Sequence, residues 1–272
     1  MNKKYIQINL KIAEQLLKDE LIALLSEIAF SGFEETDEGL SAFINMKDFD
    51  ENIFSETISK YNLTIEKKII EEQNWNALWE SSFEPVVVDN FVAVRAGFHK
   101  SIKNVLHEII ITPKMSFGTG HHATTFLMMQ QMQGLDFIEK NVFDFGTGTG
   151  ILSILAEKLG AAMVVAIDND EWSIDNAKEN IAANHCSSIQ ISLLSNPEMN
   201  KGFDIILANI NKNIILENIF ALAKQLTKKG QLLVSGLLYD DEIDIKNAAE
   251  NCKLKFIHTI QKEKWICMKF SN

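Results

Sequence analysis

Apolar and polar positions alternate with two different periods in the first seventy residues of the chain. Lys4 to Leu10 alternates at every second position, as a half-buried strand does. Residues 12–29 place apolar side chains on one face of a helix, namely Leu16, Leu17, Leu21, Leu24, Leu25 and Ile28. The pattern then predicts a helix end at Gly32, strands over 33–36 and 40–46 around a turn at 37–39, a helix over 49–61 and a strand over 63–70. This βαββαβ order predicts a small ferredoxin-like α+β domain over residues 1–70.

The segment over 71–84 predicts a connecting helix, because Trp75 and Trp79 lie one turn apart on one face. A second domain follows over 85–272, opening with a strand-like pair at 86–88 and 91–94. From residue 142 onward, buried strands alternate with helices, which is the pattern of a parallel sheet covered by helices. The strands are expected at 142–145, 163–167, 189–193, 203–208, 231–235, 254–260 and 265–270, and the helices at 151–159, 171–184, 214–226 and 241–251. The fold class expected is therefore α/β, with a Rossmann-like, mostly parallel seven-stranded sheet preceded by the small α+β domain.

Charge narrows the classes of partner. The chain has a formal net charge of -11 and only one arginine, Arg95, which argues against direct nucleic-acid binding. Residues 1–72 carry 8 Lys against 15 Asp or Glu, whereas the rest of the chain is nearly balanced. An acidic module of this kind suits a basic partner or serves solubility. With no signal peptide, no apolar span and three scattered cysteines, we expect a cytoplasmic protein that does not bind membranes.

A glycine-rich turn carries the strongest chemical signal. The run Asp144–Gly150 reads Asp-Phe-Gly-Thr-Gly-Thr-Gly and lies between a buried strand and an apolar helix, so its glycines allow a tight turn and close approach of a ligand to the backbone. Asp168 ends the next strand, where a carboxylate can accept both ribose hydroxyls of an adenine nucleoside. The glycine-rich turn and Asp168 together predict a nucleoside-binding site at the carboxyl edge of the sheet.

Two further elements fall at the same edge. The apolar strand over 204–208 finishes in Asn209, whose amide can offer its carbonyl oxygen to an amine N–H while its own NH2 group is held elsewhere; the alternative is a turn cap. Upstream, residues 112–125 form a polar loop with two glycines, and Thr124 or Thr125 is the expected N-cap of a helix over 126–132. No metal site is expected, because His121 and His122 lack acidic or Cys partners at ligand spacing.

Together, the loop Phe117-Gly-Thr-Gly-His-His-Ala-Thr-Thr125, the run Asp144–Ile151, Asp168 and Ala208–Ile210 resemble the PrmA-type bacterial methyltransferases of ribosomal protein eleven of the large subunit. The resemblance spans essentially the whole chain. It implies transfer of methyl groups from S-adenosylmethionine to lysine side chains, and to an N-terminal amine, of that basic protein. It also implies that the domain over 1–70 holds the substrate, and we expect a monomer.

The resemblance assigns particular residues as well. It places Thr125, Gly146, Asp168 and Asn209 against the donor, with Phe117, Thr119 and Gly148 on the two loops around it. Asn209 is the candidate catalytic residue. The tetrad Asn-Ile-Asn-Lys over 209–212 departs from Asn-Pro-Pro-Tyr, which counts against relatives that methylate adenine or glutamine nitrogen.

Two alternatives stay open on the residues alone. The acceptor could be a small molecule or RNA, with the acidic domain as an accessory, or the chain could be a nucleoside-binding interaction protein without turnover. A loop that closes over the site disfavours the second, because a pure binder does not need a lid that excludes water.

Overall fold

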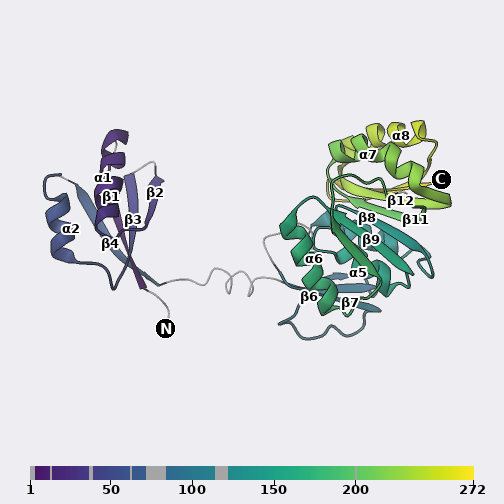
Figure 1. Cartoon of the computed structure of the whole chain (residues 1–272), viewed down its shortest axis with the longest axis horizontal. Helices are drawn as coiled ribbons and strands as arrows, with labels where there is room; N and C mark the ends of the chain where they lie inside the picture. The colour runs from purple at the N-terminus through teal and green to yellow at the C-terminus, as the bar shows by residue number, and fades with distance from the viewer. Residues whose placement is uncertain are drawn as a thin grey trace. The chain divides into compact units, whose positions relative to one another are not determined.

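The computed structural model describes residues 4–12, 14–36, 39–61, 63–71, 84–113, 122–199 and 201–272. The chain divides into two compact units, a small unit of Met1–Ser82 and a large unit of Phe83–Asn272 (Figure 1). The predicted connecting helix, with its two tryptophans, lies almost entirely outside the described residues. Among the described residues, no helix is long and apolar enough to cross a bilayer.

The small unit is a four-stranded antiparallel sheet with two helices, and its strand order is β2-β3-β1-β4. Its elements are β1 (Lys4–Lys11), α1 (Gln15–Glu27), β2 (Gly32–Thr36), β3 (Gly39–Asn45), α2 (Glu51–Ile58) and β4 (Thr64–Glu71). Alternate side chains of β1, those of Ile6, Ile8 and Leu10, are buried against Leu21 and Leu25 of α1 in one apolar core. The order of elements and of strands confirms the ferredoxin-like prediction.

The end of α1 differs from the sequence prediction. The helix stops at Glu27, and Ala29 adopts a φ of 72°, the left-handed conformation that usually falls to glycine after a helix. The backbone N–H of Phe30 then donates to the carbonyl of Leu25 at 3.2 Å, which satisfies one helix-end carbonyl. The prediction that Gly32 ends the helix is therefore wrong, and Gly32 begins β2 instead.

The large unit is built on a seven-stranded sheet of order β10-β9-β8-β11-β12-β14-β13 (Figure 1). Only β14 runs antiparallel to its neighbours, so the prediction of a mostly parallel sheet is confirmed. The strands are β8 (Asn141–Phe145), β9 (Met163–Asp168), β10 (Ile189–Leu193), β11 (Phe203–Asn209), β12 (Leu226–Leu238), β13 (Lys255–Lys262) and β14 (Trp265–Ser271). The central strands are apolar on both sides because helices cover both faces.

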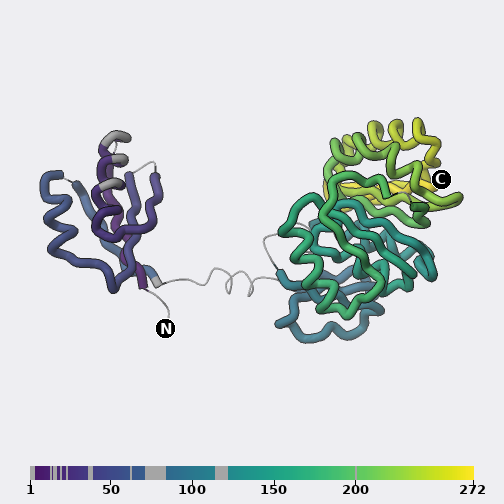
Figure 2. The backbone as a smooth tube through the Cα atoms, viewed as in Figure 1, coloured from purple at the N-terminus to yellow at the C-terminus, as the bar shows by residue number. Residues whose placement is uncertain are grey.

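Five α-helices among the described residues cover this sheet. α7 (Lys212–Gln225) and α8 (Glu242–Asn251) pack together on one face, and the opposite face carries α4 (Ala123–Met132), α5 (Ile151–Lys158) and α6 (Glu171–Ala183). Along the tube in Figure 2, the green-to-yellow segment with α7 and α8 forms one side of the unit, and the teal segment with α5 and α6 forms the other. α5, α6, α7 and α8 each begin within six residues of the carboxyl end of the strand before them, so the loops between these strands and helices are short and lie at that edge of the sheet.

A second sheet in the large unit was predicted only in part. β5 (Val86–Val88) and β6 (Val92–Ala96) match the expected pair, but β7 (His107–Ile111) adds a third strand parallel to β6. The side chains of Asn180 in α6 and of Asn184, the C-cap of this helix, hold the free edge of β7. The N–H of Ile110 donates to Asn184 Oδ1 at 2.9 Å, and that of Thr112 donates to Asn180 Oδ1 at 2.8 Å.

Candidate functional site

The glycine turn connects β8 to α5 in a conformation that only glycine adopts without strain. Gly146, Gly148 and Gly150 have φ values of 77°, 54° and 81°. The N–H groups of Gly146 and Thr147 both donate to the carbonyl of Ile167, which fastens the turn to β9. A Cβ atom on Gly146 would lie 2.3 Å from Cγ2 of Ile210, so the turn also touches the end of β11. The sequence motif therefore forms a rigid backbone cradle at the carboxyl edge.

Asp168 ends β9 beside that turn, as the sequence predicts. Its Oδ2 accepts the N–H of Gly148 at 2.8 Å, and its Oδ1 accepts the N–H of Asp170 at 3.0 Å. A carboxylate has about four lone-pair positions, so each oxygen keeps capacity for one more donor. The geometry fits a carboxylate that is held in place by backbone groups and accepts two hydroxyls from a ligand.

Asn209 ends β11, and only one of the two polar atoms of its side-chain amide has a hydrogen-bond partner among the described residues. Nδ2 donates to Oγ1 of Thr125 at 3.3 Å, whereas Oδ1 is buried and has no hydrogen-bond partner among the described residues. Thr125 itself is 2% exposed. An unpaired buried carbonyl oxygen is costly unless a ligand or water supplies a donor. An N–H group of a ligand would satisfy this oxygen.

The start of α4, which carries Thr125, differs from the prediction. The helix begins at Ala123, and its N-cap is His122, whose Nδ1 accepts the N–H of Thr124 at 3.3 Å. Thr124 and Thr125 lie inside the first turn, so the prediction that one of them is the N-cap is wrong. Histidine is not among the preferred capping residues, which is why the sequence did not single it out. Thr125 therefore lies in the first turn of α4, from which its hydroxyl oxygen accepts a hydrogen bond from Nδ2 of Asn209.

The structure thus brings most of the predicted residues into one continuous set. Thr125 contacts Asn209 through a hydrogen bond, β11 contacts the glycine turn through Ile210, and the turn contacts Asp168. The loop residues Phe117 and Thr119 lie outside the described residues. Ile210 belongs to the motif Ala208–Ile210, but the sequence pattern assigned it no role in the site.

Asp144 lies beneath the turn and is fully buried. Its Oδ2 accepts the hydroxyls of Thr147 at 2.7 Å and of Ser153 at 2.6 Å, and Oδ1 has no hydrogen-bond partner among the described residues. Burial raises the pKa of this carboxyl to about 6; the two hydroxyls oppose the rise, and the charge of Asp168 adds to it. The carboxylate ties the turn to the start of α5, at an electrostatic cost when it is ionised.

This cost predicts a pH-dependent stability. Because the folded-state pKa lies above the usual value of 3.8, the contribution of Asp144 to the free energy of unfolding is fully present below pH 4 and is lost as the pH rises through about 6. A shift of two pKa units corresponds to roughly 3 kcal/mol. Asp144→Asn cannot ionise, so its stability relative to the wild type should improve by about 3 kcal/mol between pH 4 and pH 7. Urea unfolding at several pH values measures this difference, and a difference that does not change with pH would contradict it.

Strand order, glycine turn and acidic strand end together define a class of protein. A mostly parallel seven-stranded sheet with one antiparallel strand next to its edge, and a nucleoside cradle after β8, make this chain a Rossmann-like S-adenosylmethionine-dependent methyltransferase. The site fits that donor on the grounds already given: the glycine backbone and the carboxylate of Asp168 with its spare accepting capacity.

Comparison with known proteins narrows the class. The family model described as ribosomal protein L11 methyltransferase (PrmA) matches residues 4–272. A ribosomal protein L11 methyltransferase of Phocaeicola vulgatus is 35% identical over 278 residues, covering 98% of this chain and 99% of the relative. One from Porphyromonas gingivalis is 38% identical, covering 93% and 90%. The crystal structure of a ribosomal protein L11 methylase from Lactobacillus delbrueckii subsp. bulgaricus superposes with a TM-score of 0.64 at 28% identity, covering 70% of this chain and 98% of that one.

The chain belongs to the ribosomal protein L11 methyltransferase (PrmA) family. It is therefore an enzyme of the protein-methylating class, and S-adenosylmethionine is its methyl donor. The resemblance carried by the loop, the glycine turn and the two strand ends is confirmed.

Proposed function

We propose that this enzyme methylates lysine side-chain amines, and an N-terminal amine, of ribosomal protein L11, and that Asn209 orients the accepting nitrogen. The relatives' names support the substrate, because two of them that match nearly the whole chain are called ribosomal protein L11 methyltransferases. One observation carries the proposed role of Asn209: its Nδ2 donates to Thr125, whereas its Oδ1 is buried without a hydrogen-bond partner among the described residues.

The amide carbonyl is suited to a neutral amine. It accepts one N–H of the substrate and thereby turns the nitrogen lone pair toward the methyl group, which is a problem of alignment more than of acid–base strength. The bound donor supplies a sulfonium, from which methyl transfer needs no strong general base. The substrate lysine must still lose a proton from a group of pKa about 10.4, and removal from water inside the site lowers that pKa.

We assign the donor to the contiguous set of Thr125, Gly146, Gly148, Asp168 and Asn209. In this assignment the carboxylate of Asp168 accepts the ribose hydroxyls, while the backbone of the glycine turn lies against the ligand. In the same proposal, the loop that carries Phe117 and Thr119 closes over donor and substrate.

A comparison of acceptors tests the proposal against the alternatives of a small molecule or RNA. Donor with a labelled methyl group is incubated with the enzyme and, separately, with ribosomal protein L11, ribosomal RNA or simple primary amines. We expect label in the protein alone. Label in RNA or in the free amines, with none in the protein, would overturn the assigned substrate while leaving the donor site intact.

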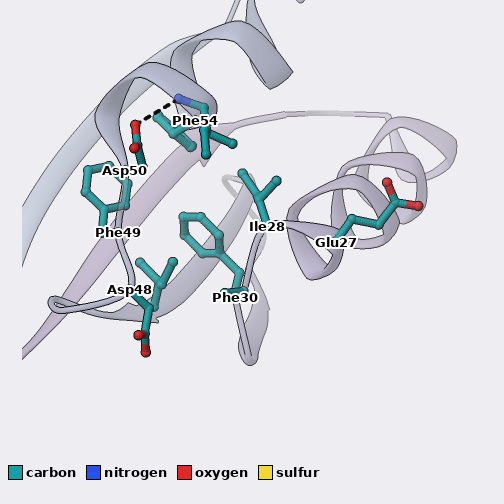
Figure 3. Close-up of a pocket in the computed structure, with 10 residues that line it drawn as sticks. Glu27, Ile28, Phe30, Asp48, Phe49, Asp50 and Phe54 are labelled. Carbon is teal, nitrogen blue, oxygen red and sulfur yellow. Dashed lines mark hydrogen bonds between the residues drawn. The ribbon is translucent and has the colours of Figure 1, made fainter.

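We assign recognition of the protein substrate to the small unit over residues 1–70. A hollow of about 270 Å³ supports this role (Figure 3). The rings of Phe30, Phe49 and Phe54 lie together at its centre, and the carboxylates of Glu27 and Asp48 lie at its border (Figure 3). Among the described residues, no Lys or Arg lines the hollow itself, although the ammonium group of Lys67 lies over the ring of Phe49. An apolar floor with an acidic border suits the aliphatic stem and ammonium group of a basic side chain.

Reversing that charge should weaken substrate capture. In Glu27→Lys with Asp48→Lys, we expect KM for ribosomal protein L11 to rise roughly fivefold or more, with kcat nearly unchanged, because both side chains are exposed and remote in sequence from the donor residues. The control is Glu56→Lys, which reverses an exposed charge of α2 outside the hollow. Equal effects of the two changes would show that the hollow has no special part.

We also infer that the enzyme acts as a cytoplasmic monomer on the protein substrate and not on nucleic acid. The net charge of -11 supports the last point, because phosphate neutralisation requires a basic surface. The proposed ribosomal substrate supports the location.

A further inference from the structure

The residues assigned to the donor lie on one side of Asn209, so the protein substrate approaches from the other side. The glycine turn and Asp168 follow β8 and β9, which lie on one side of β11, whereas β12 and β14 lie on the other. Asn209 is in register with Ser235 of β12, and β12 then continues to Leu238. A substrate chain that presents an amine to Asn209 from outside the donor site therefore meets the end of β12 and the start of β14.

Three large apolar side chains are exposed where β12 ends. Leu238 is 37% exposed, Tyr239 57% and Ile243 71%, all within six residues of chain. Their backbone is held firmly: the N–H of Leu238 donates to Asp241 Oδ2 at 2.8 Å, and that of Tyr239 donates to the carbonyl of Lys264 at 3.0 Å. Apolar groups fixed at the surface in this way are typical of interaction sites.

This group of side chains is continuous with the acceptor amide. Leu238 is in register with Trp265 of β14, and the indole of Trp265 lies 4.5 Å from the imidazole of His122, edge to face. His122 caps α4, the helix whose Thr125 holds Asn209. We call Leu238, Tyr239, Ile243, Trp265 and His122 the acceptor-side surface.

Charge indicates what this surface binds. The segment over 240–244 carries Asp240, Asp241, Glu242 and Asp244. One cation, Lys212, bridges Asp241 at 3.1 Å and Asp244 at 2.6 Å, which leaves the segment with an acidic excess. In the facing turn, the ammonium groups of Lys262 and Lys264 lie over the rings of Phe126 and Trp265. Carboxylates in excess beside exposed apolar groups favour a basic polypeptide and disfavour a phosphate backbone.

We propose that the acceptor-side surface binds the basic polypeptide segment that flanks the accepting amine. The aliphatic parts of the segment pack on Leu238, Tyr239 and Ile243, and its cationic groups face Asp240 and its neighbours. This inference rests on the proposed protein substrate, and it adds a second contact region, on the large unit, that determines which amine reaches Asn209.

The test uses the full-length enzyme with Tyr239→Ser and Ile243→Ser combined. Both side chains are exposed, so the fold should be kept. We expect KM for ribosomal protein L11 to rise at least tenfold, with kcat and the Kd of S-adenosylmethionine changed less than twofold. The matched control is Phe220→Ser, a side chain of α7 that is 70% exposed and lies eight residues beyond Lys212, away from the carboxyl edge. Unchanged KM in the double variant, or an equal rise in the control, would overturn the proposal.

Binding is measured apart from turnover, so that the two proposals fail separately. Titration of ribosomal protein L11 into the enzyme loaded with S-adenosylhomocysteine gives a Kd for wild type and variant. If the wild type binds the protein without methylating it, the assigned reaction fails, and the Kd comparison still decides the role of the surface. If the variant binds as tightly as the wild type, the surface is not the contact region.

Discussion

Asn209→Ala should lower kcat roughly 100-fold at saturating donor and substrate, because a misplaced nucleophile costs about that factor even when both ligands bind. The side chain is the only described group at the end of β11 whose oxygen is buried and unpaired. Removal of the amide also releases Thr125, so a rise of the donor Kd by less than about tenfold accompanies the loss. Initial rates at saturating donor, with the donor Kd from calorimetry, separate the two effects.

Asn218→Ala is the matched control for this change. The amide of Asn218 donates to the carbonyl of Ile214 within α7, at 2.8 Å, and the residue is half-buried. We expect its kcat to stay within twofold of the wild type. Full turnover in Asn209→Ala would show that the amine is oriented by other groups.

Asp168→Ala should act on the donor and not on the substrate. The carboxylate holds the N–H groups of Gly148 and Asp170 and is assigned two ribose hydroxyls, and each bond to a charged acceptor contributes roughly 1.5–3 kcal/mol. We therefore expect the Kd of S-adenosylmethionine to rise on the order of 100-fold, while the Kd of the protein substrate stays unchanged. Isothermal titration with each ligand measures both constants.

Asp170→Ala distinguishes donor binding from local stability. Asp170 caps α6 by accepting the N–H of Ser173 at 3.0 Å, so its loss should lower the free energy of unfolding by about 1 kcal/mol. Its donor Kd should change far less than that of Asp168→Ala. If the two variants had the same donor Kd, Asp168 would contribute only to the conformation of the loop between β9 and α6, and not to a direct contact with the donor.

Local patterns predict the parts of the site that lie within one element. β10 was expected with its observed bounds, and Asp168 and Asn209 were expected at the ends of their strands, because an apolar run followed by a polar residue marks a buried strand and its end. The glycine turn was predictable for the same reason, since its residues are adjacent in sequence.

Contacts between distant segments were not predictable. The bond from Asn209 to Thr125 joins residues 84 positions apart, and the bond of Asn184 that helps to complete β7 spans 74. The cap by His122 and the left-handed Ala29 use residue types that seldom occupy such positions, so propensity favoured Thr124 or Thr125 and Gly32. β12 was expected only over 231–235 because polar residues interrupt its start, although it begins at Leu226, which is in register with Phe203 of β11.

Mass spectrometry of intact ribosomal protein L11, after incubation with this enzyme and S-adenosylmethionine, tests the account most directly. The account predicts mass gains in steps of one methyl group, located by fragmentation on lysine side chains or the N-terminal amine, and nearly abolished in Asn209→Ala. An unchanged mass, with donor binding intact and the substrate folded, would contradict the assigned reaction.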